Sequence, residues 1–420
     1  MNTILIIAFI IGYTFIAIEN KIHINKAATA LFTGVICWTI YAIFSTDIEH
    51  LILQLGEHTG SISQILFFLI GAMTIVELID SHDGFEVITK QITTKNKRRL
   101  LWIISFITFF LSAVLDNLTT AIVMVTLIRK LLQDKNDRML FVGMIVIAAN
   151  SGGAWSPIGD VTTTMLWIGG QITTVNIILK LFLPSLVSMV IPLILISFMI
   201  KGQFTEKKKS NEKDISIIPR FEKNIVFFLG ISALIFVPVF KTITHLPPFM
   251  GILIGLSVLW IVTEMLHKKK EQEQKITVAK VIRRIDIPSI LFFLGILIAV
   301  AALESTGVLK SLATTMSDSI GDLRLISISL GVLSAIIDNV PLVAATMGMY
   351  DLQTFPTDHY FWEFIAYCAG TGGSLLIIGS AAGVAAMGIE KIDFFWYLKK
   401  ISLWALIGYL AGAAVYILFL

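Results

Sequence analysis

Long apolar runs, separated by short charged or turn-rich breaks, dominate the chain. A helix needs roughly 17–25 predominantly apolar residues to cross a bilayer. Ten runs meet this need, near 2–18, 27–45, 61–80, 139–168, 174–200, 223–240, 247–265, 287–303, 360–389 and 401–420. The pattern predicts an all-α polytopic membrane protein with ten transmembrane helices. The first run lacks a basic start, so we interpret it as a helix and not as a cleaved signal.

Two further apolar regions, 99–132 and 323–350, behave differently. Each is interrupted near its middle by an Asp-Asn pair: Asp116-Asn117 and Asp338-Asn339. Each half is too short to cross comfortably. We therefore expect two re-entrant hairpins, each entering and leaving the membrane on the same side.

The loop charges predict the orientation. With the N-terminus outside, the inward loops are 19–26, 81–98, 133–138, 201–222, 266–286 and 390–400, and several carry clusters of Lys and Arg. The outward loops 46–60 and 351–359 carry Asp and Glu but no Lys or Arg. This is the positive-inside asymmetry, and it requires both hairpins to make no net crossing. Both termini are predicted outside, in a bacterial inner (plasma) membrane.

An internal repeat supports this organisation. Ser112–Asn117 (SAVLDN) matches Ser334–Asn339 (SAIIDN) at an offset of 222, and Ser151-Gly152-Gly153 matches Thr371-Gly372-Gly373 at 220. Five crossings and one hairpin per repeat place the second repeat upside down relative to the first. The predicted units are a first inverted repeat, 1–200, a cytoplasmic linker, 201–222, and a second inverted repeat, 223–420.

Composition agrees with the membrane class. Of 420 residues, 56% are hydrophobic and 15% charged, against about 25% charged in soluble domains. The mean hydropathy is +0.85. Cys37 and Cys368 lie in apolar stretches and are expected to pack as small hydrophobes. No run of His or Cys has the spacing of a transition-metal site.

Three carboxylates, Asp116, Asp160 and Asp338, fall deep in predicted membrane segments. A charge there costs about 2.5–3.5 kcal/mol, so each needs a partner or a purpose. No Lys or Arg lies in the adjoining segments, which favours ion binding over buried salt bridges. Protonated acids that only hydrogen-bond for packing remain the alternative. Glu77, Asp80 and Glu304 lie at ends of spans and are interpreted as interfacial.

Glycines mark a second unusual feature. Residues 150–164 contain three Gly and one Pro within eight positions, and 369–380 form their repeat partner. Such a stretch should unwind a membrane helix where a cavity or protein satisfies the backbone. Asp160 aligns with Ser380, so one repeat carries an additional acid. Gly383 and Gly388 are interpreted as helix-packing glycines.

Carboxylate, amide and hydroxyl oxygens beside helix ends suit a hard cation such as Na⁺. A cation and a proton compete for the same oxygens. A site that holds either ion and faces each side in turn is an antiporter, and Asp116, Asp160 and Asp338 are the candidate cation and proton carriers.

With these residues in view, the chain resembles the NhaD-type Na⁺/H⁺ antiporters of the ion transporter superfamily, which also holds arsenite permeases and dicarboxylate transporters. The most specific parts are Leu115–Thr120 (LDNLTT), Ser151–Thr163 (SGGAWSPIGDVTT) and Ile337–Pro341 (IDNVP). The resemblance implies export of Na⁺ or Li⁺ against H⁺ as the transported ions, no cofactor, and an elevator motion of a transport domain beside a dimerising scaffold. The scaffold helices would be 1–80 and 223–303, and the transport elements 99–200 and 323–420.

The resemblance also implies the ion-site positions. They are Asp116, Asn117, Asn150, Asp160, Thr162, Thr163, Ser334, Asp338 and Asn339, with Ser374 and Ser380 as less distinctive members. Oxyanion transporters of the superfamily typically carry Ser-Asn-Thr at the hairpin tips. Asp at both tips therefore argues against an anionic substrate.

Three other functions stay open on the sequence. A proton-coupled permease for arsenite or a small carboxylate is the nearest alternative. An intramembrane aspartyl protease would carry Gly-x-Gly-Asp, whereas Asp160 follows Pro157-Ile-Gly. A channel could use the same oxygens. The expected partners are membrane lipid and a second copy of the chain, with no nucleic acid and no enzymatic reaction.

Overall fold

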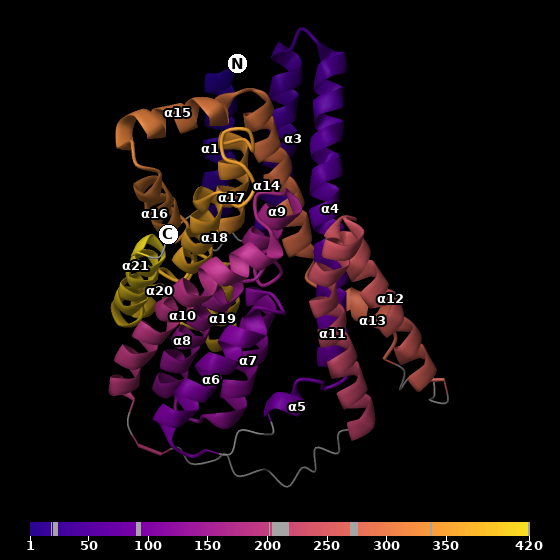
Figure 1. Cartoon of the computed structure of the whole chain (residues 1–420), viewed down its shortest axis with the longest axis vertical. Helices are drawn as coiled ribbons and strands as arrows, with labels where there is room; N and C mark the ends of the chain where they lie inside the picture. Colours follow the sequence, from indigo (N-terminus) through magenta and orange to yellow (C-terminus); the bar gives the residue numbers. More distant parts are fainter. Residues whose placement is uncertain are drawn as a thin grey trace.

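The computed structural model describes residues 1–17, 19, 24–89, 94–200, 202–203, 218–268, 276–336 and 338–418. Most of the predicted linker 201–222 and parts of the inward loops 19–26, 81–98 and 266–286 lie outside these residues. Within the described ranges the structure is helical apart from turns, and its isolated β-bridge joins Asn96 to Gln203. Figure 1 shows a bundle of helices with the N-terminus at one end.

The helices of the first half follow the predicted runs closely. They are α1 (Asn2–Ala17), α3 (Lys26–Phe44), α4 (Ile48–Ser81), α5 (Glu86–Thr89), α6 (Lys97–Ser112), α7 (Asn117–Leu131), α8 (Lys135–Ala154), α9 (Val161–Ile168) and α10 (Thr174–Met199).

The second half has a similar order. Its helices are α11 (Arg220–Thr244), α12 (Pro248–Leu266), α13 (Val278–Val281), the 3₁₀ turn η1 (Ile282–Arg284), α14 (Ile287–Ser305), α15 (Val308–Ile320), α16 (Leu323–Leu333), α17 (Asn339–Met349), α18 (Tyr360–Gly372), α19 (Ala381–Glu390), α20 (Phe394–Lys400) and α21 (Ser402–Leu418).

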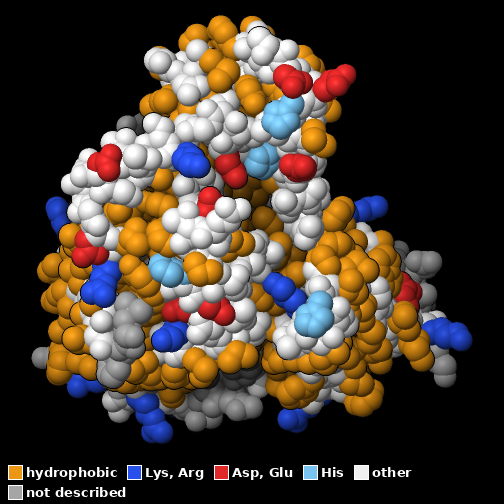
Figure 2. Space-filling model, turned by 45° about the horizontal axis from the view of Figure 1, so that its top comes forward, with side chains coloured by type: hydrophobic (Ala, Val, Ile, Leu, Met, Phe, Trp, Pro, Cys, Tyr) orange, Lys and Arg blue, Asp and Glu red, His pale blue; other side chains and the backbone are white. Residues whose placement is uncertain are grey.

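The chain is a multi-pass membrane protein. Among the residues described, six helices are long and apolar enough to span a bilayer, or seven if α20 and α21, bent by 54°, form one span. Large apolar side chains such as Ile43, Leu179 and Ile243 are exposed on the outer helix faces, as expected where lipid replaces water. Figure 2 shows hydrophobic side chains over much of the flanks and acidic and His side chains on the end turned to the viewer.

Helix α4 corrects one predicted loop. The sequence predicts an outward loop at 46–60, but α4 begins at Ile48 and runs for 34 residues. At 1.5 Å per residue it is about 51 Å long, well beyond a hydrocarbon core of about 30 Å. Its polar residues are accommodated in the helix: Gln54 accepts a hydrogen bond from Tyr41, and His58 bonds Ser305 at 3.0 Å. Polar positions ended the apolar run without ending the helix.

The predicted helix breaks are confirmed. Residues 113–116 separate α6 from α7, and 155–160 separate α8 from α9. Glycine is required at the second break, because a Cβ on Gly159 would lie 2.6 Å from the carbonyl oxygen of Ser112. Gly383 packs as expected, since a Cβ there would lie 2.1 Å from the Ile377 oxygen. The packing interpretation of Gly388 is wrong: a Cβ at this residue would meet no atom within 4 Å, so Gly388 faces open space.

The two halves make equivalent contacts around the breaks. Helix α6 packs on α8, and α16 packs on α18. Ser112 Oγ donates to the Ala149 oxygen at 2.6 Å, and its repeat partner Ser334 donates to the Ala369 oxygen at 2.9 Å. Helices α8 and α18 also contact each other, which brings both sets of breaks to one region.

A second group of helices flanks this region. Helix α3 packs on α1 and α14, while α4 packs on α11, α12 and α14. Small residues permit this packing: a Cβ on Gly295 would lie 2.4 Å from backbone atoms of Ala30 and Leu31. Both cysteines, Cys37 and Cys368, are buried and free, as the sequence predicted.

Candidate functional site: a convergence of helix breaks

Four helices begin at the region where the breaks meet. Helices α7, α9, α17 and α19 have as their N-caps Asp116, Asp160, Asp338 and Ser380. Each of these side chains accepts a backbone N–H of the first turn, which is why Asp and Ser are favoured there. The positive ends of four helix dipoles therefore point to one region, and three of them carry a carboxylate.

Asp160 lies at the centre of the site and is 1% exposed. Its Oδ1 accepts hydrogen bonds from the Thr162 backbone N–H and hydroxyl, both at 2.9 Å. Its Oδ2 accepts from Asn117 Nδ2 at 2.6 Å and lies 3.4 Å from Asn339 Nδ2. The amides of Asn117 and Asn339, the first residues of α7 and α17, thus both reach Asp160.

Asn150 joins the two halves of the site. Its Oδ1 accepts from Asn117 Nδ2 at 3.0 Å. Its Nδ2 donates to Ser374 Oγ at 3.1 Å and to Ser380 Oγ at 2.9 Å. All of these residues are buried. The network runs continuously from Asn117 at the start of α7, through Asn150 of α8, to Ser374 and Ser380 in the break between α18 and α19.

Asp116 opens onto a small cavity. Its Oδ1 accepts from the Thr119 N–H and its Oδ2 from the Thr119 hydroxyl, each at 2.7 Å. The cavity is about 40 Å³, enough for one water molecule or one ion, and Asp116, Asn117 and Asp160 line it beside α4, α11 and α14. Nearby, the buried Thr120 hydroxyl has no hydrogen-bond partner among the described residues. The polar tip thus faces an apolar wall built by the flanking helices.

Asp338 differs from the other two acids. Its Oδ2 lies 3.5 Å from Lys26 Nζ, and its backbone N–H donates to Tyr13 Oη at 3.1 Å. The absence of Lys and Arg from the adjoining segments favoured ion binding over salt bridges, but Asp338 does form an ion pair, with a Lys from a distant part of the chain. Lys26 begins α3, more than three hundred residues away in the chain, so the adjoining segments could not reveal it. Lys26 Nζ also lies 4.4 Å from the Phe292 ring centroid.

We expect Asp338→Asn and Lys26→Met to lower cation transport by no more than about fivefold each. The two side chains are 15% and 23% exposed, and a partly exposed ion pair is worth about 0–1 kcal/mol. The double variant should be no worse than either single variant, because both remove the same interaction. Transport assays in vesicles measure this. Loss of transport in Asp338→Asn alone would instead make Asp338 a direct ion ligand.

The remaining predicted positions are distributed around this network. Thr163 Oγ1 donates to the Asp160 backbone oxygen, and Ser334 is bonded to Ala369 and not to another predicted site residue. Three residues were missed: Ser112, Tyr13 and Lys26. The repeat match with Ser334 could have identified Ser112, whereas Tyr13 and Lys26 belong to flanking helices and carry no local signal.

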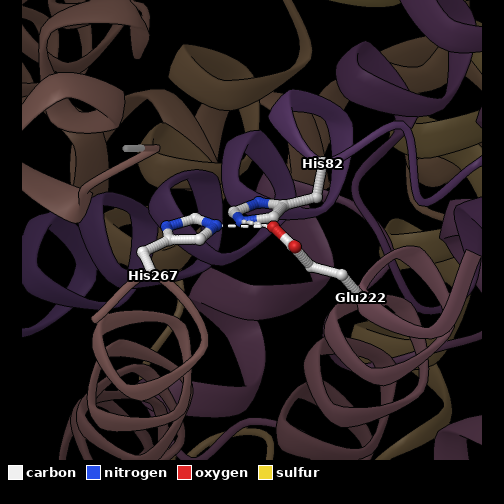
Figure 3. Close-up of side chains that lie close together, drawn as sticks. All are labelled: His82, Glu222 and His267. Carbon is white, nitrogen blue, oxygen red and sulfur yellow. Dashed lines mark hydrogen bonds and ion pairs between the residues drawn. The ribbon is translucent and has the colours of Figure 1, made fainter. Parts of the chain in front are cut away.

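The structure also gathers a buried cluster outside the transport site. His82, Glu222 and His267 lie with ligand atoms within 4.8 Å of one another (Figure 3). The sequence-based statement that no metal-type cluster exists is corrected by this finding. The three residues come from the end of α4, the start of α11 and the end of α12, so no spacing rule connects them.

Comparison with known proteins places these features in a family. A family model described as a citrate transporter matches residues 13–362. The chain is 52% identical to sodium/proton antiporter 1 of Arabidopsis thaliana over 97% of this chain and 71% of that protein. It is 31% identical to the Na⁺/H⁺ antiporter NhaD of Alkalimonas amylolytica over 97% of this chain and 89% of that protein. The identity to the Na⁺/H⁺ antiporter NhaD of Vibrio cholerae is 29%, over 98% of this chain and 91% of that protein.

These similarities extend across the helix breaks and the acids that cap them. The matched residues 13–362 include Asp116, Asp160 and Asp338. The chain therefore belongs to the NhaD-type group of the ion transporter superfamily.

Proposed function

We propose that the protein is a secondary active Na⁺ (or Li⁺)/H⁺ antiporter. One observation carries the proposal: Asp160 is buried and receives amide groups from both hairpin tips. Within the described part of the chain no Lys or Arg forms an ion pair with it. A buried carboxylate of this kind needs a proton or a cation as its partner. The relatives named as sodium/proton antiporters support the same conclusion.

The proposed mechanism is competition at shared oxygens. Asp116 and Asp160 line the cavity and supply negative charge. A hard cation favours such oxygen ligands. When Na⁺ binds between Asp116 and Asp160, a carboxyl group of this pair loses its proton. When a proton returns to the carboxylate, the cation leaves. In this arrangement Asp338 is held by Lys26, so we assign it to the coupling of α3 with the second tip.

Electrostatics disfavour a carboxylate substrate, which the nearest alternative, a proton-coupled permease for arsenite or a small carboxylate, would allow. Four helix N-termini at the site would attract an anion if they were capped by neutral side chains. Here Asp116 and Asp160 place negative charge at two of them, and Lys26 balances the charge of Asp338 at a third. A multivalent carboxylate would meet like charge at these positions. The cation assignment therefore follows from the caps and not from the fold, which the superfamily shares.

The architecture that we propose for this function is two inverted repeats with ten crossings and two re-entrant hairpins. Helices α5 and α15 begin 222 residues apart and lie toward opposite ends of the molecule in Figure 1. The matching bonds of Ser112 and Ser334 support the same repeat. Elevator motion, a homodimer formed by the flanking helices, and a bacterial inner membrane with both termini outside complete the proposal.

The decisive experiment is dissipation of a preformed ΔpH in everted vesicles from a host that lacks its own Na⁺/H⁺ antiporters. Addition of Na⁺ or Li⁺ should restore the fluorescence of a pH-sensitive dye with the wild-type protein, and Asp116→Asn should lose this response. K⁺ serves as the comparison cation. No response of the wild-type protein to any cation would contradict the proposal. Arsenite and dicarboxylate uptake would then be measured, as the permease alternative requires.

A further inference from the structure

We propose that His82, Glu222 and His267 form a binding site for a divalent transition-metal ion, with Zn²⁺ as the representative metal. The three residues lie where α4 and α12 end and α11 begins (Figure 3), and none of them lines the cavity beside Asp116 and Asp160. All three are buried: His82 is 0%, His267 1% and Glu222 4% exposed. Two imidazoles and one carboxylate are a recurrent zinc ligand set.

The ring orientations fit metal ligation. His82 Nδ1 lies 2.7 Å from the Leu78 carbonyl oxygen, and His267 Nδ1 lies 3.1 Å from the Ile276 carbonyl oxygen. A carbonyl only accepts, so each Nδ1 carries the hydrogen and each Nε2 of a neutral ring presents its lone pair. Metal-binding histidines usually donate their other N–H to a carbonyl or carboxylate in this way.

Both lone pairs are directed to the same carboxylate. Glu222 Oε1 lies 2.5 Å from His267 Nε2 and 3.8 Å from His82 Nε2. The two rings are parallel within 5°, with centroids 5.2 Å apart. A shared proton can bridge only His267 and Glu222, because 3.8 Å exceeds a hydrogen bond. A metal ion uses all three ligands after side-chain shifts of about 1 Å, because bonds of roughly 2.0–2.2 Å to one tetrahedral centre place the ligand atoms about 3.3–3.6 Å from one another. Glu222 Oε1 and His267 Nε2 would move apart from 2.5 Å, and His82 Nε2 would move closer to Glu222 Oε1.

The positive charge of Lys223, beside the site, is neutralised by other acids and does not oppose a bound cation. Lys223, the neighbour of Glu222, lies 3.0 Å from Asp83 Oδ2 and 2.8 Å from Glu86 Oε2. Its charge is thus balanced by the turn that follows α4. The three ligands supply one negative charge, from Glu222. The bound ion would join the end of α4 to α11 and α12, and so connect the two halves of the chain.

The experiment uses full-length protein, purified in detergent without a polyhistidine tag, stripped with chelator and reloaded with Zn²⁺. Elemental analysis should find about one zinc per chain. His267→Gln and Glu222→Gln should bind at least about 100-fold more weakly, since loss of even an outer-shell partner costs 10–100-fold. His50→Gln is the matched control: His50 is exposed at the opposite end of α4, and its binding should equal wild type.

A second measurement does not depend on the variants. Co²⁺ bound to the wild-type protein should give visible absorption bands typical of an ion with nitrogen and oxygen ligands in low coordination. Wild-type protein without stoichiometric zinc at micromolar free metal would overturn the proposal. Unchanged zinc binding in folded His267→Gln or Glu222→Gln protein would also overturn it.

Discussion

Replacement of Asp160 by Asn is expected to weaken cation/proton exchange by one to two orders of magnitude. The Asp160 carboxylate Oδ2 accepts from Asn117 Nδ2 and lies near Asn339 Nδ2. An Asn side chain with its NH₂ group at this position would place that donor against the NH₂ donors of Asn117 and Asn339. The substitution also removes the charge that pairs with the cation. Charged hydrogen bonds are worth about 1.5–3 kcal/mol, which corresponds to a loss of roughly 10- to 150-fold in affinity. The ΔpH assay in everted vesicles, over a range of Na⁺ concentrations, measures the effect.

A matched control separates the loss of the carboxylate charge from any loss of helix N-capping. Asp47 also caps a helix, accepting the His50 N–H at 3.0 Å, but it is exposed and lies outside the site. Since Asn and Asp are equally good N-caps, Asp47→Asn should keep wild-type exchange. If Asp160→Asn protein reached the membrane folded and exchanged Na⁺ as the wild type does, Asp160 would not be the ion-binding acid.

Replacement of Gly152 by Ala is expected to destabilise the protein by at least about 3 kcal/mol, the upper range for overpacked cores. A Cβ at this position would lie 2.2 Å from the Phe109 carbonyl oxygen, which is backbone and cannot rotate away. Helices α6 and α8 would have to separate, and α8 carries Asn150 into the site. The measurement is thermal unfolding of the detergent-solubilised protein, monitored as the fraction of protein that remains monodisperse after heating.

Gly388 provides the contrast for this substitution. It lies in α19, and no atom lies within 4 Å of an added Cβ. Gly388→Ala should leave stability unchanged or raise it by about 0.5–1 kcal/mol, as expected in a helix. The repeat partner Gly372→Ala should resemble Gly152→Ala, because its Cβ would lie 2.1 Å from the Gly331 oxygen. Equal stability of Gly152→Ala and Gly388→Ala would show that α6 and α8 leave room for a methyl group between them.

The structure distinguishes the roles of Asp116, Asp160 and Asp338. In the sequence all three are carboxylates in apolar segments, but in the fold they have different partners. Asp160 accepts hydrogen bonds from the side-chain amides of Asn117 and Asn339. Asp116 lines the cavity and accepts from the Thr119 N–H, whereas Asp338 is paired with Lys26. The Lys26 pair links α3 to Asp338, the N-cap of α17. Because this ion pair is partly exposed, its substitution should have a modest effect on transport.

The apolar runs and their interruptions determined the membrane class, most of the helix bounds and the positions of the breaks. These features are local: a helix in lipid must be apolar over its length, and a polar or glycine-rich break is visible wherever it occurs. The internal match at offsets of 220 and 222 also singled out Asp116, Asp160 and Ser380. These residues do cap helices at one shared region.

Only the tertiary structure decided which side chains meet across the chain. Lys26 reaches Asp338 from α3, and His82, Glu222 and His267 come together from three helix ends. Such contacts depend on how helices pack, which sequence spacing does not encode. Helix α4 gives the opposite case: its polar residues suggested a loop, but Tyr41 and Ser305 on neighbouring helices pair with them. A buried polar group is stable wherever packing provides its partner, and packing is a property of the whole fold.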